Sequence, residues 1–195
     1  MRNILNGQIS LASYCTLLRN LYEIYAALEP ALKRHATHAC IAPVYQPALA
    51  RSGALSADLR ALYGARWVEG LEVMPAGHQY RQRVAEIAES RPELLVAHAY
   101  TRYLGDLNGG QILRRIVAET LGLGAGAGTE FYAFPAVENP GATAQGYRDA
   151  LDRIPVDDAL ADGIVLEAQH AFALHIRLFE ELASAPTPQT LRSPA

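Results

Sequence analysis

Three glycines and an aspartate lie within a six-residue span of an otherwise strongly helix-forming stretch, YLGDLNGGQILRR, at residues 103–115. Each glycine in a helix interior costs about 1 kcal/mol relative to alanine, so their presence needs a physical reason. In a helix one face, about 100° of arc wide, would carry Arg102, Gly105, Asp106, Gly109 and Leu113. That face has no bulk at its centre and ionisable groups beside it.

A helix face without Cβ atoms can lie almost flat on a planar ligand. A large, flat, partly polar cofactor suits it better than another helix, whose apolar surface would desolvate Asp106 at a cost. Packing stays open as an alternative, because Gly105 and Gly109 also form a G-x-x-x-G pair that lets two helices approach closely. A phosphate-binding loop is excluded, since Gln111 stands where its lysine belongs.

Two other groups of residues could bind a ligand or react, but their patterns are weaker. Glu167 and His170 make one E-x-x-H motif, whereas a di-iron carboxylate bundle needs two. No metal-ligand set is predicted. Phe172, His175 and Phe179 lie on one stripe of the last predicted helix, and this stripe fits either core packing or the wall of a pocket.

The composition of the 195-residue chain is that of a globular protein and limits its partners. Half of the residues are apolar, 19% are charged and the net charge is −3, which gives no general attraction to nucleic acid. No stretch approaches the roughly 20 apolar residues that cross a bilayer, so no membrane anchor is expected. Cys15 and Cys40 have no metal or redox spacing and fit a reducing, cytoplasmic setting.

Apolar residues at spacings of three and four predict an all-α bundle of about seven or eight helices. Pro30 is expected to kink or end the first helix. Ser90 and Glu93 are expected to form the capping box of the long glycine-bearing helix. One helical domain is predicted over 1–183, followed by a disordered tail over 184–195. The helices are expected at 11–29, 56–63, 76–89, 90–121, 142–153 and 158–183.

The glycine stretch lies in a longer segment, RPELLVAHAYTRYLGDLNGGQILRRIVAETLGL, which closely resembles the signature region of haem oxygenases. The core pattern of that family is G-D-L-S-G-G-Q, and Asn108 stands here in place of its serine. The stretches LYEIYAALEPAL, APVYQPAL, ALYGARW and AFALHIRLFEEL are similar to the family in order and spacing. The resemblance covers about residues 1–183 and implies an all-α fold, in which haem is sandwiched between a proximal helix and a kinked distal helix.

The resemblance also implies a reaction. Haem oxygenases cleave haem, which is both substrate and cofactor, to biliverdin, CO and ferrous iron. They use O₂ and electrons from a reductase or ferredoxin, so a redox partner protein is expected. Two alternatives stay open: a haem- or bilin-binding paralogue without oxygen chemistry, and a di-iron oxygenase on a related helical scaffold.

Several positions match the distal side of the family's haem site. Gly105 and Gly109 would let the backbone of the distal helix press on the haem face. Asp106 would hold a water network that delivers protons, and Tyr25 and Arg102 match the tyrosine and arginine of that network.

Three further positions match residues at the edge of the haem. Phe172 and Phe179 match pocket walls, and Arg148 matches a basic residue that pairs with a haem propionate. Ala144 stands where some members carry a lysine, which leaves the rotation of the haem open.

The axial histidine of the family has no match in this sequence, because its expected place lies shortly before the stretch that MRNIL resembles. We expect that the functional protein carries a segment before Met1 with this histidine. We also expect that the chain without it binds haem weakly, turns over little and leaves the apolar stripe of the helix at 11–29 exposed.

Overall fold

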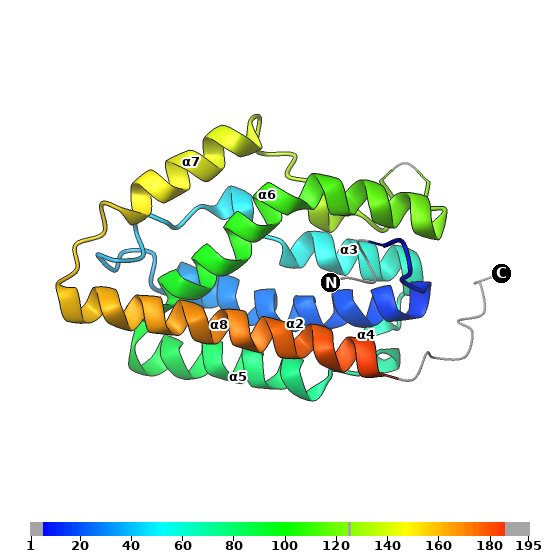
Figure 1. Cartoon of the computed structure of the whole chain (residues 1–195), viewed down its shortest axis with the longest axis horizontal. Coiled ribbons are helices and arrows are strands. Elements are labelled where there is room, and N and C mark those ends of the chain that lie inside the picture. The colour runs from blue at the N-terminus through cyan, green and yellow to red at the C-terminus, as the bar shows by residue number, and fades with distance from the viewer. Residues whose placement is uncertain (1–5, 125, 186–195) are drawn as a thin grey trace.

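The computed structural model describes residues 6–124 and 126–185, and within these ranges the chain is all-α, with no strand (Figure 1). This confirms the predicted fold class. Of the predicted tail, residues 186–195 lie outside the described ranges, and Ser184 still belongs to the last helix. The α-helices are α2 (Leu11–Arg34), α3 (Ser52–Tyr63), α4 (Trp67–Gly70), α5 (Pro75–Ser90), α6 (Leu95–Leu121), α7 (Pro140–Leu151) and α8 (Asp158–Ser184), and the 3₁₀ helices are η1 (Pro47–Leu49), η2 (Pro92–Leu94) and η3 (Glu130–Tyr132).

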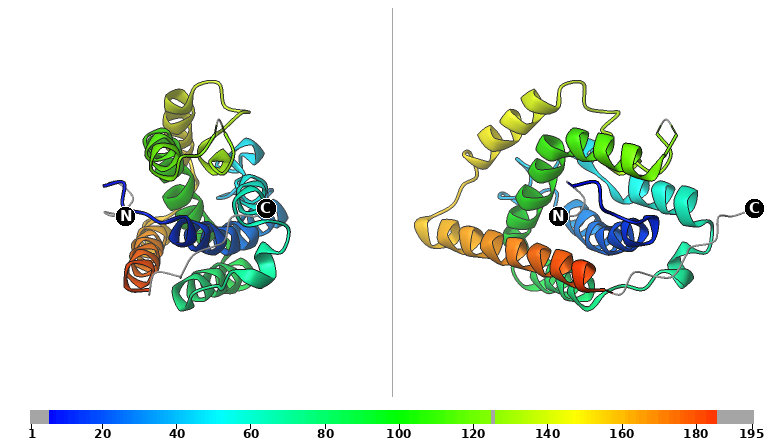
Figure 2. Two further views of the ribbon diagram at one scale, coloured as in Figure 1. Left: turned by 90° about the vertical axis from the view of Figure 1, so that its right-hand side faces the viewer. Right: turned by 45° about the vertical axis from the view of Figure 1, so that its right-hand side comes forward.

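Helix α2 forms the centre of the fold. It packs against α3, α5, α6 and α8, and α6 packs in turn against α7 and α8. Figure 1 shows that α6 changes direction part-way along its length, and Figure 2 shows α7 as an outlying arm between α6 and α8. The candidate site lies between α2, α6 and α8.

The apolar stripe of α2 is buried in the core, so the expectation that it would be exposed is wrong. Tyr14, Ile24, Tyr25 and Leu28 have no accessible surface, because α3, α5 and α6 surround the helix. Exposed apolar side chains gather instead on α8, at Val165, Leu166, Phe172 and Ile176.

Two local predictions about helix ends are also wrong. Pro30 does not end α2, which continues to Arg34, and its side chain is exposed. A kink at Pro30 stays a prediction. Ser90 does not cap α6, because it is the last residue of α5 and its hydroxyl donates to the Glu86 carbonyl at 2.7 Å. Gly122 ends α6 with a φ of 62°, the left-handed conformation that glycine favours after the last turn of a helix.

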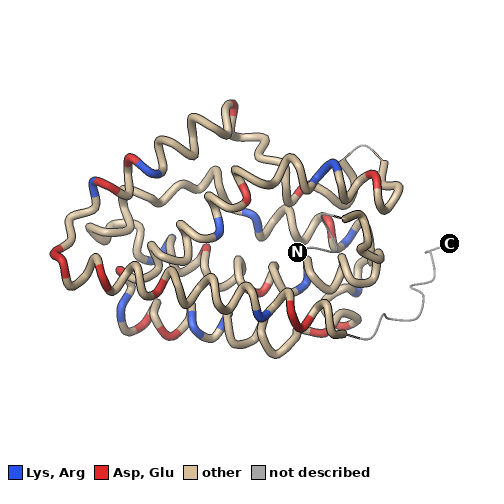
Figure 3. Tube along the Cα trace, in the orientation of Figure 1, with Lys and Arg blue, Asp and Glu red and all other residues tan. Residues whose placement is uncertain are grey.

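Charges of both signs are interspersed along the helices (Figure 3). None of the helices within residues 6–124 and 126–185 combines the length and the apolar character that crossing a membrane requires.

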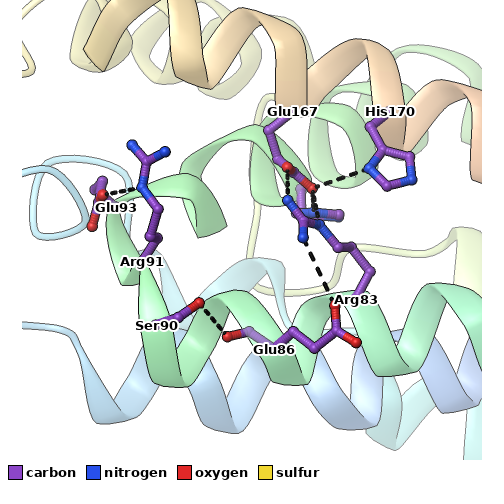
Figure 4. A network of polar contacts seen from close by, with 8 residues as sticks. Arg83, Glu86, Ser90, Arg91, Glu93, Glu167 and His170 are labelled. Carbon is purple, nitrogen blue, oxygen red and sulfur yellow. Dashed lines mark hydrogen bonds and ion pairs between the residues drawn. The ribbon is translucent and has the colours of Figure 1, made fainter. Parts of the chain in front are cut away.

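A buried ion-pair cluster ties α8 to α5 and α6 (Figure 4). Glu167 accepts hydrogen bonds from Arg83 Nε and His98 Nε2, each at 2.9 Å, and His170 Nδ1 lies 3.8 Å from it. Burial alone would raise the pKa of Glu167, but the hydrogen bonds from Arg83 and His98 lower the pKa to about 2. The E-x-x-H pair therefore belongs to a structural cluster. Within the described ranges, no three His, Cys, Asp or Glu side chains are grouped to hold a metal ion.

Glu167→Gln should lower the free energy of unfolding by about 2 kcal/mol at neutral pH, because Arg83 and His98 lose their anionic acceptor. Urea denaturation measures this difference. Glu86→Gln is the control, since Glu86 is exposed and lies 3.8 Å from Arg83; it should cost less than about 0.5 kcal/mol.

The effect of Glu167→Gln on the free energy of unfolding should depend on pH. The folded state lowers the pKa of Glu167 from 4.5 to about 2. Its stabilisation is therefore present above about pH 4.5 and is lost as the pH falls towards 2. The difference in the free energy of unfolding between the parent and Glu167→Gln should therefore shrink as the pH falls from 4.5 to about 2. A difference that stays constant over this range would contradict the stabilising role of the Glu167 anion.

Candidate functional site

An open cavity of about 160 Å³ lies between α2, α6 and α8, with η3 on one side. The carboxylate of Asp58 holds η3 in place by accepting hydrogen bonds from the backbone N–H groups of Glu130 and Phe131, both at 2.8 Å. Five of the predicted site residues line the cavity: Arg102, Gly105, Asp106, Phe172 and Phe179.

Two of the three glycines in this part of α6 leave the helix backbone bare. A Cβ atom built on Gly105 or Gly109 would meet no atom of the described residues within 4 Å. No other described helix packs there, so the helix-packing explanation of this G-x-x-x-G pair is wrong. Gly110 is different, because its Cβ would lie 3.5 Å from the carbonyl oxygen of Tyr132. Gly110 thus packs against η3, while Gly105 and Gly109 leave open space beside the backbone.

A polar network of Tyr25, Arg102, Asp106 and His175 borders the cavity. The Tyr25 hydroxyl donates to the Asp106 carboxylate and accepts from Arg102 Nε at 3.2 Å. Arg102 Nη2 lies 3.3 Å from Asp106 Oδ1, and Arg102 Nη1 lies 3.0 Å from His175 Nδ1. Because Arg102 and Asp106 are four residues apart, one turn of α6 is enough to bring them together.

Burial and the guanidinium group of Arg102 set the protonation states in this network. Burial raises the pKa of Asp106, although Arg102 and the Tyr25 hydroxyl oppose the shift. Burial also raises the pKa of Tyr25 well above its usual value. The pKa of His175 falls to about 2, through burial and the adjacent Arg102 charge. At neutral pH the network therefore holds a charged arginine, a neutral tyrosine, a neutral histidine and a carboxyl group with raised proton affinity.

The other three predicted site residues do not line the cavity. Tyr25 is fully buried behind the cavity, and Gly109 lies one turn beyond Gly105 on the same face of α6. Arg148 is exposed on α7 and is not among the residues that line the cavity.

His175 is the member of the network that sequence analysis did not assign to it. The spacing of His175 with Phe172 and Phe179 placed it on a possible pocket wall. Its partner Arg102 is 73 positions away in the chain, and no local pattern reveals a pair at that separation.

Comparison with known proteins identifies the relatives of this chain. A family model described as "Heme oxygenase" matches residues 1–181. Heme oxygenase 1 of Nostoc sp. is 42% identical over 178 residues, which cover 91% of this chain and 75% of that protein. Heme oxygenase 1 of Homo sapiens is 41% identical over 192 residues, which cover 97% of this chain and 67% of that protein.

Solved structures agree with the sequence relationship. The crystal structure of heme oxygenase-1 from the cyanobacterium Synechocystis sp. in complex with heme matches with a TM-score of 0.90 and 40% identity, over 94% of this chain and 82% of that one. The structure of heme oxygenase from Leptospira interrogans matches with a TM-score of 0.89 and 37% identity, over 92% and 88% of the two chains. Sequence and fold together show that the chain belongs to the haem oxygenase family.

Proposed function

We propose that the chain binds haem and cleaves its ring oxidatively to biliverdin, CO and ferrous iron, with O₂ and electrons from a reductase or ferredoxin. Family membership supports the reaction, and the relative solved in complex with heme supports the ligand. The observation that carries the proposal is the bare face at Gly105 and Gly109, which adjoins the network of Tyr25, Arg102 and Asp106.

The residues present fit haem. The space that a Cβ atom would occupy at Gly105 and Gly109 is open, as a flat ring against the helix requires. Phe172 and Phe179 supply apolar walls for the ring. Arg148 is exposed, and its only hydrogen bond outside the helix ladder among the described residues is made by its backbone carbonyl. Its guanidinium group is therefore available to pair with a propionate.

Bound haem supplies the iron that activates O₂ and the ring carbon that is oxidised. The protein contributes orientation and proton transfer. Asp106 is the proton-handling group, because its pKa is raised and it borders the cavity. Tyr25 donates a hydrogen bond to Asp106, and Arg102 contacts both side chains and holds them in one arrangement.

The free state of both cysteines supports the inferred cytoplasmic setting of this reaction. Cys15 and Cys40 are buried and form no disulfide, as expected for a protein that works under reducing conditions.

A second candidate function is the binding of haem or a bilin without oxygen chemistry. His175 is the one histidine among the described residues that line the cavity, and its Nδ1 already accepts from Arg102. It is therefore not free to bind iron through that nitrogen. The formation of a bilin from haem and a reductant separates the two functions.

Gly109→Leu tests the proposed haem face. The leucine should keep or increase the helicity of the unliganded chain, yet weaken haem binding at least about tenfold, because its side chain would fill the space that the ring needs. Circular dichroism and a spectrophotometric haem titration measure the two effects. Gly53→Leu, at another helical glycine with open space around its Cβ, is the control and should bind haem like the parent. Parental affinity in Gly109→Leu would overturn the flat-face argument.

Asp106→Asn should keep haem binding within about threefold and lower the yield of bilin about a hundredfold. The amide retains the shape of the carboxyl group but cannot carry its proton. Haem titration and bilin formation driven by ascorbate measure the two properties, with exposed Asp149→Asn as the control. An unchanged bilin yield in the Asp106 variant would remove Asp106 from the mechanism.

Arg148→Ala should cost only about 1 kcal/mol of haem affinity, because Arg148 is exposed to solvent. Its larger effect should fall on the proportions of the bilin isomers, since a propionate pair fixes the rotation of the ring. Chromatographic separation of the products measures these proportions. Arg153→Ala, at an exposed arginine just after α7, is the control. If Arg148→Ala and its parent give the same isomers, the assignment of Arg148 is wrong.

A further inference from the structure

His175 occupies an unusual position beside the buried guanidinium group of Arg102. Its Nδ1 lies 3.0 Å from Arg102 Nη1, and its Nε2 lies 3.4 Å from the same atom. The imidazole and the Phe179 ring meet in a T-shaped arrangement, with ring centroids 4.7 Å apart. The ring is thus held between the cavity and a cation.

The chemistry of the two groups determines the state of the imidazole. An arginine side chain has only hydrogen-bond donors, and a protonated imidazole also has only donors. A hydrogen bond between Arg102 and His175 therefore requires a lone pair on the accepting ring nitrogen, and so a neutral ring. Nδ1 is the nearer nitrogen, at 3.0 Å against 3.4 Å for Nε2, so we assign the lone pair to Nδ1 and the remaining proton to Nε2. The pKa of His175, lowered to about 2 by burial and by Arg102, agrees with this state.

Arg102 has three acceptors, one from each helix around the cavity. Its Nε reaches Tyr25 on α2, its Nη2 reaches Asp106 on α6, and its Nη1 reaches His175 on α8. Arg102 is thus the charged group in contact with the imidazole, and it carries the contact on to Tyr25 on α2 and Asp106 on α6. Loss of the His175 acceptor would leave Nη1 with no partner among the described residues, in a side chain that is 5% exposed.

We propose that His175 is a positioning residue: as a neutral hydrogen-bond acceptor it fixes Arg102, and through Arg102 it holds the Asp106 carboxylate in place. The contribution to proton transfer rests on the proposed function of Asp106. The hydrogen-bond arrangement itself does not, so it can be tested in the unliganded full chain.

The first test is the protonation state of His175 in the parent protein, which long-range ¹H–¹⁵N NMR of histidine rings reports. The His175 signals are those that disappear in His175→Asn. We expect a neutral ring with its proton on Nε2 and no protonation down to pH 5. A ring that titrates near its usual pKa of about 6.5, or one that carries its proton on Nδ1, would overturn the proposal.

The second test is the pKa of Asp106, followed by ¹³C NMR of its carboxyl group and assigned with Asp106→Asn. His175→Leu removes the acceptor and should raise the pKa of Asp106 by about one unit, since Arg102 is no longer held beside it. His175→Asn keeps an acceptor oxygen and should leave this pKa within about 0.2 units of the parent value. His170→Asn, at an exposed histidine of the same helix, is the control and should have no effect.

An unchanged pKa of Asp106 in His175→Leu, or an equal rise in both the leucine and the asparagine variants, would overturn the proposal. If His175→Leu fails to fold, two measurements still test the proposal: the tautomer of His175 in the parent and the pKa of Asp106 in His175→Asn. A separate haem titration of the parent tests the proposed function. Failure to bind haem would count against that function and not against the role of His175.

Discussion

The buried guanidinium group of Arg102 is the interaction on which the arrangement of the site depends. A charge that is removed from water needs partners for its donors, and each donor left unpaired costs free energy. Arg102 finds these partners on three different helices, in Tyr25, Asp106 and His175. The positions of α2, α6 and α8 around the cavity are therefore coupled through one side chain, and a shift of any of the three would leave a buried donor unpaired.

The glycines of α6 show a second constraint, in which stability is given up for an open surface. Gly105 and Gly109 each lower helix stability by about 1 kcal/mol relative to alanine, and neither gains a packing contact among the described residues in return. Gly110 does gain one, against Tyr132. The bare face thus follows the general expectation that a binding site departs from the sequence that would best stabilise the fold.

Much of this arrangement follows from local sequence patterns. Apolar spacing predicts the helices and the all-α class, and the 100° step of a helix is enough to place Arg102, Gly105 and Asp106 on one face. Local rules for helix ends failed at two positions. Pro30 stays inside α2 at an exposed position, and Ser90 finds its acceptor in the helix that it ends.

The partners that define the site were the least predictable part. His98 meets Glu167 across 69 positions, and His175 meets Arg102 across 73. Neither pair can be predicted from residue spacing or composition, because each depends on how two helices cross. Arg148 differs from these pairs, because its role was predicted from family resemblance alone. Its exposed position on α7 is compatible with pairing to a haem propionate but does not require it.

Two carboxyl groups of the bundle, those of Glu167 and Asp106, have opposite electrostatic environments. Glu167 accepts from Arg83 and from His98, and these donors outweigh burial, so the pKa of Glu167 falls to about 2. Asp106 has Arg102 beside it, but it shares that cation with two other acceptors, and burial prevails, so the pKa of Asp106 rises. Glu167 is consequently fixed as an anion that joins three helices, whereas Asp106 retains the capacity to take up and release a proton. The balance between burial and the donors that reach each carboxyl group therefore separates a carboxylate that stabilises the fold from one that suits proton transfer.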